Sequence, residues 1–268
     1  MFGHVASRSF AVLLVLSLPV LAGSASAFAQ YQANASAADV IAADSAAPSR
    51  QAARELEPFG LDALPVTGGE LLHKWRDLVA EIRAESDILT RCRAAAELCP
   101  AAAQKFLAVI AEGRAHEGRA RIGVINRAIN LAIRPTSDLV QWGVADRWSA
   151  PLATLATGRG DCEDYAIAKY VALTEAGVGA DDVKLIIVHD LAAGADHAVV
   201  TARLDEKWIV LDNRRLALIE DVEVAQVLPL FVLDRDGVRQ FAATSLAGSH
   251  NAEPPVEATA PAPAALRF

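Results

Sequence analysis

"GRGDCEDYAIAKY" (residues 158–170) sets one cysteine among three carboxylates, directly after a Gly-Arg-Gly turn. The residues after Asp161 predict a helix that ends at Gly177, because glycine commonly terminates helices. Cys162 would then lie in the first helical turn, where free backbone N–H groups favour a thiolate and can stabilise an oxyanion. Carboxylates beside a thiol oppose its ionisation. The stretch is therefore either a solvated helix start or a site that needs a nearby positive charge.

The acidic residues also have a purely structural interpretation. Asp161 is a suitable N-cap, and Asp164 stands where the acidic partner of a capping box stands. Glu163 would then be solvated and Cys162 would be inert. A lone cysteine becomes a catalytic candidate only when a base and an orienting group accompany it.

A histidine and an aspartate further along the chain could supply these groups. "ADHAVVTARLDEKWIVLDN" (residues 195–213) predicts strands at 197–204 and 207–212, joined by a two-residue turn. An antiparallel hairpin places the start of its first strand beside the end of its second, so His197 and Asp212 should meet. Asp212 would hold the imidazole tautomer, and His197 would activate Cys162.

Two other interpretations stay open on these residues alone. His197 and Asp212 also fit a surface histidine and an aspartate in a strand-end turn. His189 and Asp190 form a rival pair, but neighbouring strand residues point to opposite faces and would orient each other poorly.

The periodicity of the remaining chain predicts helices followed by strands. Apolar residues recur at helical spacing over residues 69–90, after Pro100 and over residues 120–133, whereas residues 137–160 are expected to be irregular. From residue 183 the period is two, and "PLFVLD" and "VRQFAA" flank "RDG" as a further hairpin. Helices first and an antiparallel sheet later predict an α+β fold.

The chain ends differ in composition from this region. Residues 1–27 have a weakly basic start, an apolar run and small residues, which is the layout of a secretory signal peptide. The apolar run is shorter than the ~20 residues that span a bilayer, so we expect cleavage and no membrane insertion afterwards. We expect a poorly ordered lead-in at 28–66, a folded domain at 67–245 and a disordered Pro/Ala-rich tail at 246–268.

Charge and cysteine content exclude several classes of function. A net charge of −8 argues against a nucleic-acid partner, which requires clustered lysine and arginine. Cys92 and Cys99 either form a disulfide in an oxidising compartment or remain two buried thiols, and Cys162 is left over. The absence of a CxxC pair argues against redox catalysis, and the few converging cysteines and histidines argue against zinc. We expect a monomer.

One long block resembles a known family. It comprises "INRAINLAIRPTSDLVQWGVADRWSAPLATLATGRGDCEDYAIAKYVAL" (residues 125–173), followed by "DHAVV" and "WIVLDN". The block resembles the bacterial transglutaminase-like cysteine proteases of the LapG type, and the resemblance extends over residues 69–242. It implies a papain-like, transglutaminase-like α+β fold, in which N-terminal helices pack on an antiparallel sheet and the nucleophile begins a helix. It also implies a cysteine endopeptidase with nucleophile Cys162, base His197 and orienting acid Asp212.

The resemblance further implies a calcium ion beside the nucleophile. Asp161 and Glu163 match the acids that flank the cysteine in that family, and Asp146 is the candidate third ligand, with the Trp148 carbonyl as a further one. Calcium binds six to eight oxygen ligands. A divalent cation would reverse the local sign of charge around Cys162.

The family's biology defines the expected partners. The resemblance implies a periplasmic enzyme that cuts the N-terminal region of a large RTX-type surface adhesin at a dialanine-type site, which releases the adhesin and disperses biofilm. The periplasmic domain of an inner-membrane receptor for cyclic-di-GMP would sequester the enzyme. Two alternatives are amide transfer between proteins from the same acyl-thioester, and an exported binding module that does not use the triad.

Overall fold

The computed structural model describes residues 57–242 of the 268-residue chain. The predicted signal peptide (1–27), residues 28–56 of the predicted lead-in and the predicted tail (246–268) lie outside the described residues. Within residues 57–242, no helix is both long enough and apolar enough to cross a membrane.

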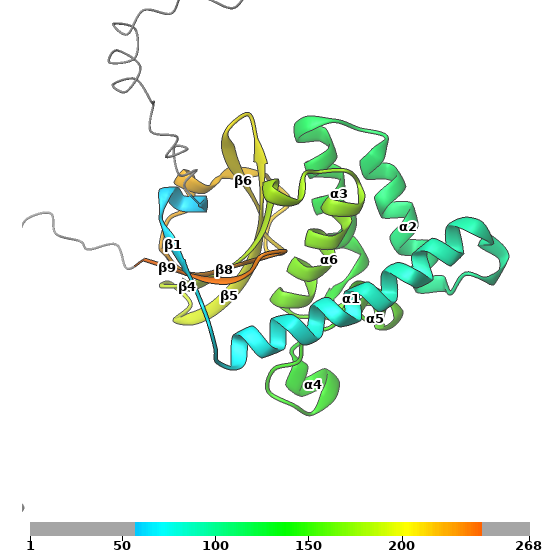
Figure 1. Ribbon diagram of the computed structural model, residues 1–268, viewed down its shortest axis with the longest axis horizontal. Helices are drawn as coiled ribbons and strands as arrows, with labels where there is room; N and C mark the ends of the chain where they lie inside the picture. The colour runs from blue at the N-terminus through cyan, green and yellow to red at the C-terminus, as the bar shows by residue number, and fades with distance from the viewer. Residues whose placement is uncertain (1–56, 243–268) are drawn as a thin grey trace, which may run out of the picture. The chain divides into compact units, whose positions relative to one another are not determined.

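Helices dominate the first part of the described region and strands the second (Figure 1). The helices are α1 (Glu70–Ala94), α2 (Ala101–Arg114), α3 (Gly118–Ala132), α4 (Asp138–Trp142), α5 (Pro151–Thr157) and α6 (Cys162–Glu175). The strands are β1 (Ala63–Pro65), β2 (Arg134–Pro135), β3 (Arg159–Gly160), β4 (Val183–Asp190), β5 (Ala195–Leu204), β6 (Lys207–Leu211), β7 (Ile219–Glu220), β8 (Val227–Asp234) and β9 (Gly237–Phe241). Short 3-10 helices lie at Pro58–Gly60, Ala96–Leu98, Ala180–Asp182 and Asp221–Glu223.

Seven strands form one antiparallel sheet, in the order β1-β9-β8-β4-β5-β6-β7. The predicted β5–β6 hairpin is confirmed, since Leu204 pairs with Lys207 across two turn residues. Those residues, Asp205 and Glu206, have φ values of 50° and 65°, as a two-residue hairpin turn with two left-handed positions requires. The β8–β9 hairpin is confirmed as well.

Side-chain alternation gives the sheet two apolar faces. On β4, Val183 and Leu185 belong to the large core that the sheet shares with the helices. Ile186 and Val188 belong to a smaller core on the other face, which also contains Phe241. Helices packed on one face of an antiparallel sheet confirm the predicted α+β class.

Helix α6 is enclosed by other elements. It packs against α2, α3 and α5 and against strands β4 and β5. Ile167, Ala168 and Leu173 have no exposed surface, and the Tyr165 hydroxyl donates to the Ile133 carbonyl at 2.6 Å. This enclosure fixes the start of α6, and with it Cys162, on a rigid element.

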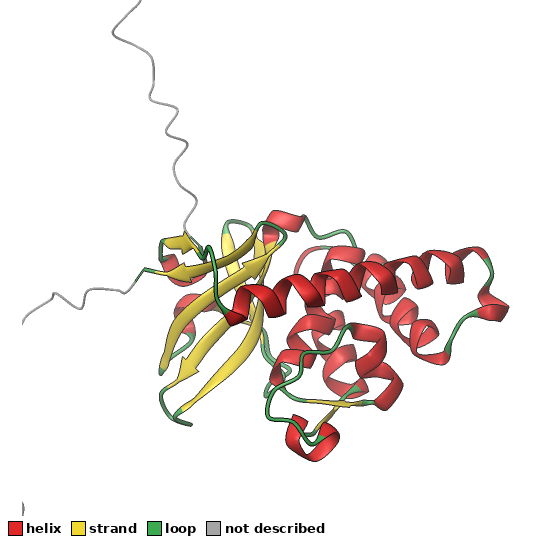
Figure 2. Cartoon of the chain, turned by 60° about the horizontal axis from the view of Figure 1, so that its bottom comes forward, coloured by secondary structure: helices red, strands yellow, loops and turns green. Residues whose placement is uncertain are grey.

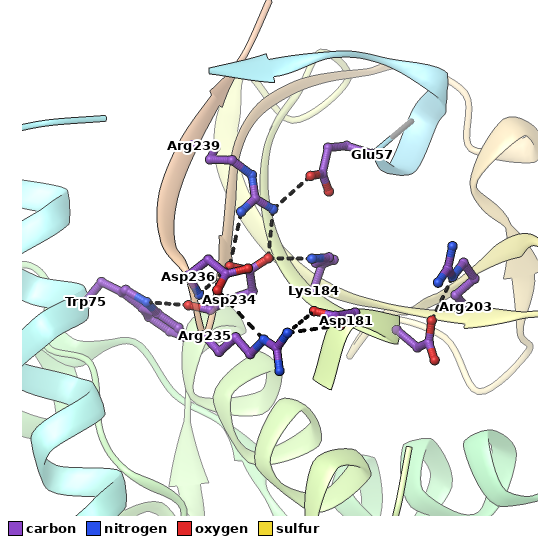
Figure 3. Close-up of polar contacts among 10 residues, drawn as sticks. Glu57, Trp75, Asp181, Lys184, Arg203, Asp234, Arg235, Asp236 and Arg239 are labelled. Carbon is purple, nitrogen blue, oxygen red and sulfur yellow. Dashed lines mark hydrogen bonds and ion pairs between the residues drawn. The ribbon is translucent and has the colours of Figure 1, made fainter. Parts of the chain in front are cut away.

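Helix α1 connects the sheet with the helical side of the fold, since it packs against β9 and against α2 and α5 (Figure 2). A buried polar network holds it at the sheet. Asp234 accepts Lys184 Nζ at 2.5 Å and Arg239 Nη2 at 2.7 Å, while its carbonyl accepts Trp75 Nε1 at 3.0 Å (Figure 3). At the far end of α1, Cys92 and Cys99 form a disulfide, which confirms the first of the two interpretations above.

Two expectations require correction. Strand β1 lies inside the predicted lead-in (28–66) and pairs with β9, so ordered structure begins before residue 67. Residues 137–160 are not irregular, because they contain α4 and α5. Helices of five and seven residues are too short to show a recognisable apolar period.

Candidate active site

Cys162 and His197 line one cleft of about 480 Å³. Cys162 comes from the start of α6 and His197 from β5, whereas α1 contributes Lys74 to another wall. The remaining lining residues are Glu70, Leu71, Ala145, Asp146, Trp148, Glu163, Ile187, Asp196, Ala198 and Phe231. A cleft of this size can accommodate a segment of peptide.

His197 and Asp212 form the pair that the hairpin register predicts. His197 Nε2 lies 3.0 Å from Asp212 Oδ1, and the two side chains are 4% and 7% exposed. Burial raises the pKa of Asp212, but hydrogen bonds from His197 and from the Arg214 backbone N–H outweigh it and hold the pKa at about 2. Asp212 is therefore ionised at neutral pH and accepts a hydrogen bond from Nε2–H.

The other imidazole nitrogen of His197 is available for chemistry. Nδ1 is buried and has no hydrogen-bond partner among the described residues. Because Asp212 holds the proton on Nε2, Nδ1 carries the lone pair. A neutral imidazole in the same cleft as a thiol can act as a general base.

The rival pair does not form. His189 Nδ1 contacts Asp196 Oδ1 at 2.8 Å, and Asp190 pairs instead with Arg214 Nη1 at 2.5 Å. The side chains of His189 and Asp196 are 37% and 66% exposed, unlike the buried pair of His197 and Asp212.

The surroundings of Cys162 oppose its ionisation. Burial raises the pKa of Cys162 to about 12, and the carboxylates of Glu163 and Asp161 act in the same direction. The thiol donates to Glu163 Oε2 at 3.1 Å, whereas a hydrogen bond from the Ala198 backbone N–H lowers the pKa of Cys162. A thiolate at neutral pH therefore needs an additional positive charge.

An acidic cluster lies beside the nucleophile. Asp138, Asp161 and Glu163 each offer an oxygen, and these oxygens lie within 4.8 Å of one another. Burial raises the pKa of Asp161 to about 8, with the carboxylates of Glu163 and Asp138 contributing, and it also raises the pKa of the other two acids. Buried carboxylates this close repel each other unless protons or a cation neutralise them.

The expected N-cap is not formed. Asp161 occupies the N-cap position of α6 but makes no side-chain capping hydrogen bond. Its Oδ2 instead accepts the backbone N–H of Asp138 at 3.3 Å, and Asp164 accepts that of Ser149 at 3.0 Å. Both acids thus bind the loop before α6 rather than the helix itself.

Asp138 joins Asp161 and Glu163 in the acidic cluster, and the expected third ligand Asp146 stays a prediction. Asp146 is exposed and pairs with Lys74 of α1. Parallel pairing of β2 with β3 sets Pro135 opposite Gly160, so Asp138 lies next to Asp161 although 23 residues separate them. Periodicity could not reveal this two-residue strand pair, although Asp138 stood inside the block that carries the resemblance.

Gly160 has a steric reason for being glycine. An added Cβ would lie 2.6 Å from Asp164 Cβ and 2.5 Å from Asp164 Oδ2. Gly158, with φ of 62°, ends α5 in the left-handed conformation that glycine tolerates. The two glycines of "GRG" thus place the acids and Cys162 against the preceding loop.

A thiol at a helix N-terminus shares a cleft with His197, and the buried Asp212 contacts the imidazole from outside that cleft. This is the arrangement of a cysteine hydrolase with a catalytic triad. Residues 86–224, just over half of the chain, match the family described as bacterial transglutaminase-like cysteine proteinase. The chain belongs to this family and is a cysteine protease.

The chain is also similar to three solved structures of Legionella pneumophila LapG. One is 18% identical, with a TM-score of 0.48 over 58% of this chain and 86% of that chain. An EGTA-treated form is 19% identical, with a TM-score of 0.49 over 60% of this chain and 87% of that chain. A calcium-bound form is 16% identical, with a TM-score of 0.47 over 65% of this chain and 92% of that chain. No curated protein sequence matches the chain.

Proposed function

We propose that the protein is a periplasmic, calcium-dependent cysteine endopeptidase that cuts the N-terminal region of a large surface adhesin at a dialanine-type site. One observation carries the catalytic part. Cys162 and His197 share a cleft, and Asp212 Oδ1 lies 3.0 Å from His197 Nε2, which leaves Nδ1 for proton transfer. Release of the adhesin would then promote biofilm dispersal.

The residues suggest the following reaction. His197 Nδ1 removes the proton from Cys162 Sγ, and the thiolate attacks the carbonyl carbon of the scissile bond. The backbone N–H groups at the start of α6 stabilise the resulting oxyanion. His197 then donates its proton to the leaving amine, and water hydrolyses the thioester with His197 again as base.

The donor set fits calcium. Asp138 Oδ1 and Asp161 Oδ1 are buried without hydrogen-bond partners among the described residues, and Glu163 offers a third oxygen. Hard carboxylate oxygens are the ligands that calcium prefers. Asp138, Asp161 and Glu163 would hold the ion, whose positive charge would offset the carboxylates that raise the pKa of Cys162.

Export and partners complete the proposal. The Cys92–Cys99 disulfide supports an oxidising compartment, and the composition of residues 1–27 supports secretion. Cleavage of an RTX-type adhesin and sequestration by the periplasmic domain of a cyclic-di-GMP receptor rest on the family resemblance.

The test is cleavage of the N-terminal region of a co-encoded adhesin by the mature protein. Three samples contain calcium, EGTA, or calcium with the Cys162→Ala variant. We expect two fragments in the first sample only. Cleavage by the Cys162→Ala variant would exclude the thiol mechanism, equal cleavage with EGTA would exclude calcium dependence, and a crosslinked product would instead establish amide transfer.

A further inference from the structure

A second hollow, of about 460 Å³, lies between α1 and the β8–β9 hairpin. Its walls carry the arginines Arg76, Arg83, Arg235 and Arg239 and only one acid, Asp236. We call it the arginine hollow. The other lining residues are Pro65, Val66, Leu72, Trp75, Val79, Gly237 and Val238.

The arginine hollow and the catalytic cleft lie on different faces of α1. Glu70 and Lys74 line the cleft, whereas Arg76, Val79 and Arg83 line the hollow. Successive helical residues rotate by about 100°, so these two sets point in roughly opposite directions. A molecule in the hollow would therefore leave access to Cys162 free.

Two of the four arginines are already used by the fold. Arg239 pairs with Asp234 at 2.7 Å and with Glu57 at 2.8 Å, and Arg235 pairs with Asp181 at 2.8 Å (Figure 3). Within residues 57–242, Arg76 and Arg83 form no ion pair and no side-chain hydrogen bond. Both are exposed on α1, two helical turns apart.

The floor of the hollow is apolar. Val66 and Val79 are partly buried and Val238 is buried, and all three line it together with the buried Leu72 and Trp75. An apolar floor below a guanidinium rim suits a ligand that combines carboxylates with an apolar side chain. The protein as a whole has a net charge of −8, so this concentration of arginine is a local feature.

We propose that the arginine hollow binds an acidic polypeptide segment of a partner protein. Carboxylates of the segment pair with Arg76 and Arg83, and an apolar side chain between them lies on the valine floor. Seven helical residues span about 10 Å, which an extended peptide covers with about three residues. A small inorganic anion would leave the apolar floor unused. The proposal does not depend on catalysis by Cys162.

The test measures binding of a fluorescein-labelled octapeptide of Asp and Glu with two central leucines to the mature protein. We expect the Arg76→Glu/Arg83→Glu double variant to weaken binding at least about tenfold, because two charge-assisted contacts become repulsive. Arg127→Glu is the matched control, because Arg127 is exposed on α3 and has no ion pair within residues 57–242. This variant should change the binding affinity less than about twofold. Cleavage activity should be the same in all three proteins.

Three results would overturn the proposal. The first is no binding, or equal weakening by Arg127→Glu. The second is competitive inhibition of cleavage, since this would place the peptide in the catalytic cleft. The third is self-association of the protein that the double variant abolishes, which would assign the hollow to a second copy of the chain.

Discussion

Lys169 is a charge buried in the helix that carries the nucleophile. Its side chain has no exposed surface, and Nζ has no hydrogen-bond partner among the described residues. Nζ lies 5.9 Å from the centre of the Tyr165 ring. Burial lowers the pKa of Lys169 to about 7, and the carboxylate of Asp212 opposes this effect. An ammonium group with so little compensation destabilises the folded state.

Replacement of Lys169 by methionine should therefore stabilise the protein. The pKa of Lys169 in the folded state lies below the unfolded value of 10.5. The destabilisation by the buried ammonium group is therefore fully present below pH 7 and disappears as pH rises to about 10.5. We expect Lys169→Met to raise the free energy of unfolding by at least about 1 kcal/mol at pH 6, and by less at pH 10. Urea denaturation at both pH values measures this. Lys105→Met, at an exposed site on α2, should leave the free energy of unfolding unchanged. A gain in stability of Lys169→Met that is the same at both pH values would contradict the argument.

The His197–Asp212 geometry makes a second prediction. Asp212→Asn should keep the fold but lower kcat/KM by about 10²- to 10⁴-fold, because the amide no longer fixes the imidazole tautomer. Asp190→Asn is the matched control, since Asp190 belongs to the rival pair and its carboxylate contacts Arg214 Nη1 and the Ala192 and Ala193 backbone N–H groups. Equal losses in both variants would remove Asp212 from the triad. Because the pKa of Asp212 is about 2, its titration should not change kcat/KM above about pH 3.

Individual residues differ in how far the sequence predicts them. His197 and Asp212 follow from one local hairpin, where register is set by a two-residue turn. Asp138 depends on the distant β2–β3 pair, and the carboxylate of Asp161 turns towards it rather than towards the helix. The local sequence around Asp161 favours a helix cap, because it contains no information on the β2–β3 pair that brings Asp138 close.

At the scale of elements, the loop before α6 must pack closely on the helix start. Gly160→Ala would force its Cβ against buried Asp164, whose pKa burial already raises to about 7. We expect a loss of about 1–3 kcal/mol in the free energy of unfolding and weaker calcium binding, because Asp161 directly follows the displaced strand β3.

Gly68→Ala is the control for this substitution. No atom lies within 4 Å of an added Cβ at Gly68, and its backbone is not left-handed. Thermal unfolding and calcium titration of both variants make the comparison. A Gly160→Ala protein as stable as Gly68→Ala would show that the loop can move away from α6.

Long elements were predicted better than short ones. The helix expected at 69–90 is α1, and the β5–β6 and β8–β9 hairpins have the expected strands. Helix α5 was missed, and its position depends on tertiary contacts. Glu85 of α1 accepts the Leu152 and Ala153 backbone N–H groups at 2.8 and 3.1 Å, which ties the start of α5 to α1.

At the scale of the whole molecule, the acidic cluster should make stability depend on calcium and pH. The pKa of Asp161 is raised from 3.8 to about 8, so without the ion the folded state takes up protons and loses stability as pH rises between those values. Calcium should therefore raise the melting temperature more at pH 8 than at pH 5.

The expected increase is about 5–10 °C at pH 8 and a calcium concentration of 100 Kd, from about 2.7 kcal/mol of linkage in a domain of this size. Differential scanning calorimetry with calcium or EGTA measures it. Asp138→Asn should reduce the increase, whereas Asp146→Asn should preserve it because Asp146 lies outside the cluster. A smaller calcium-induced rise in melting temperature for Asp146→Asn than for Asp138→Asn would instead support Asp146 as the ligand.

The rate of Cys162 alkylation by iodoacetamide, measured against pH with calcium and with EGTA, tests the central claim most directly. Cys92 and Cys99 are joined, so Cys162 is the one free thiol of the three cysteines in the chain. We predict fast reaction at pH 7 with calcium, and with EGTA a rise only above about pH 9, towards the raised pKa of about 12. Identical profiles in the two conditions would contradict a calcium-dependent cysteine protease.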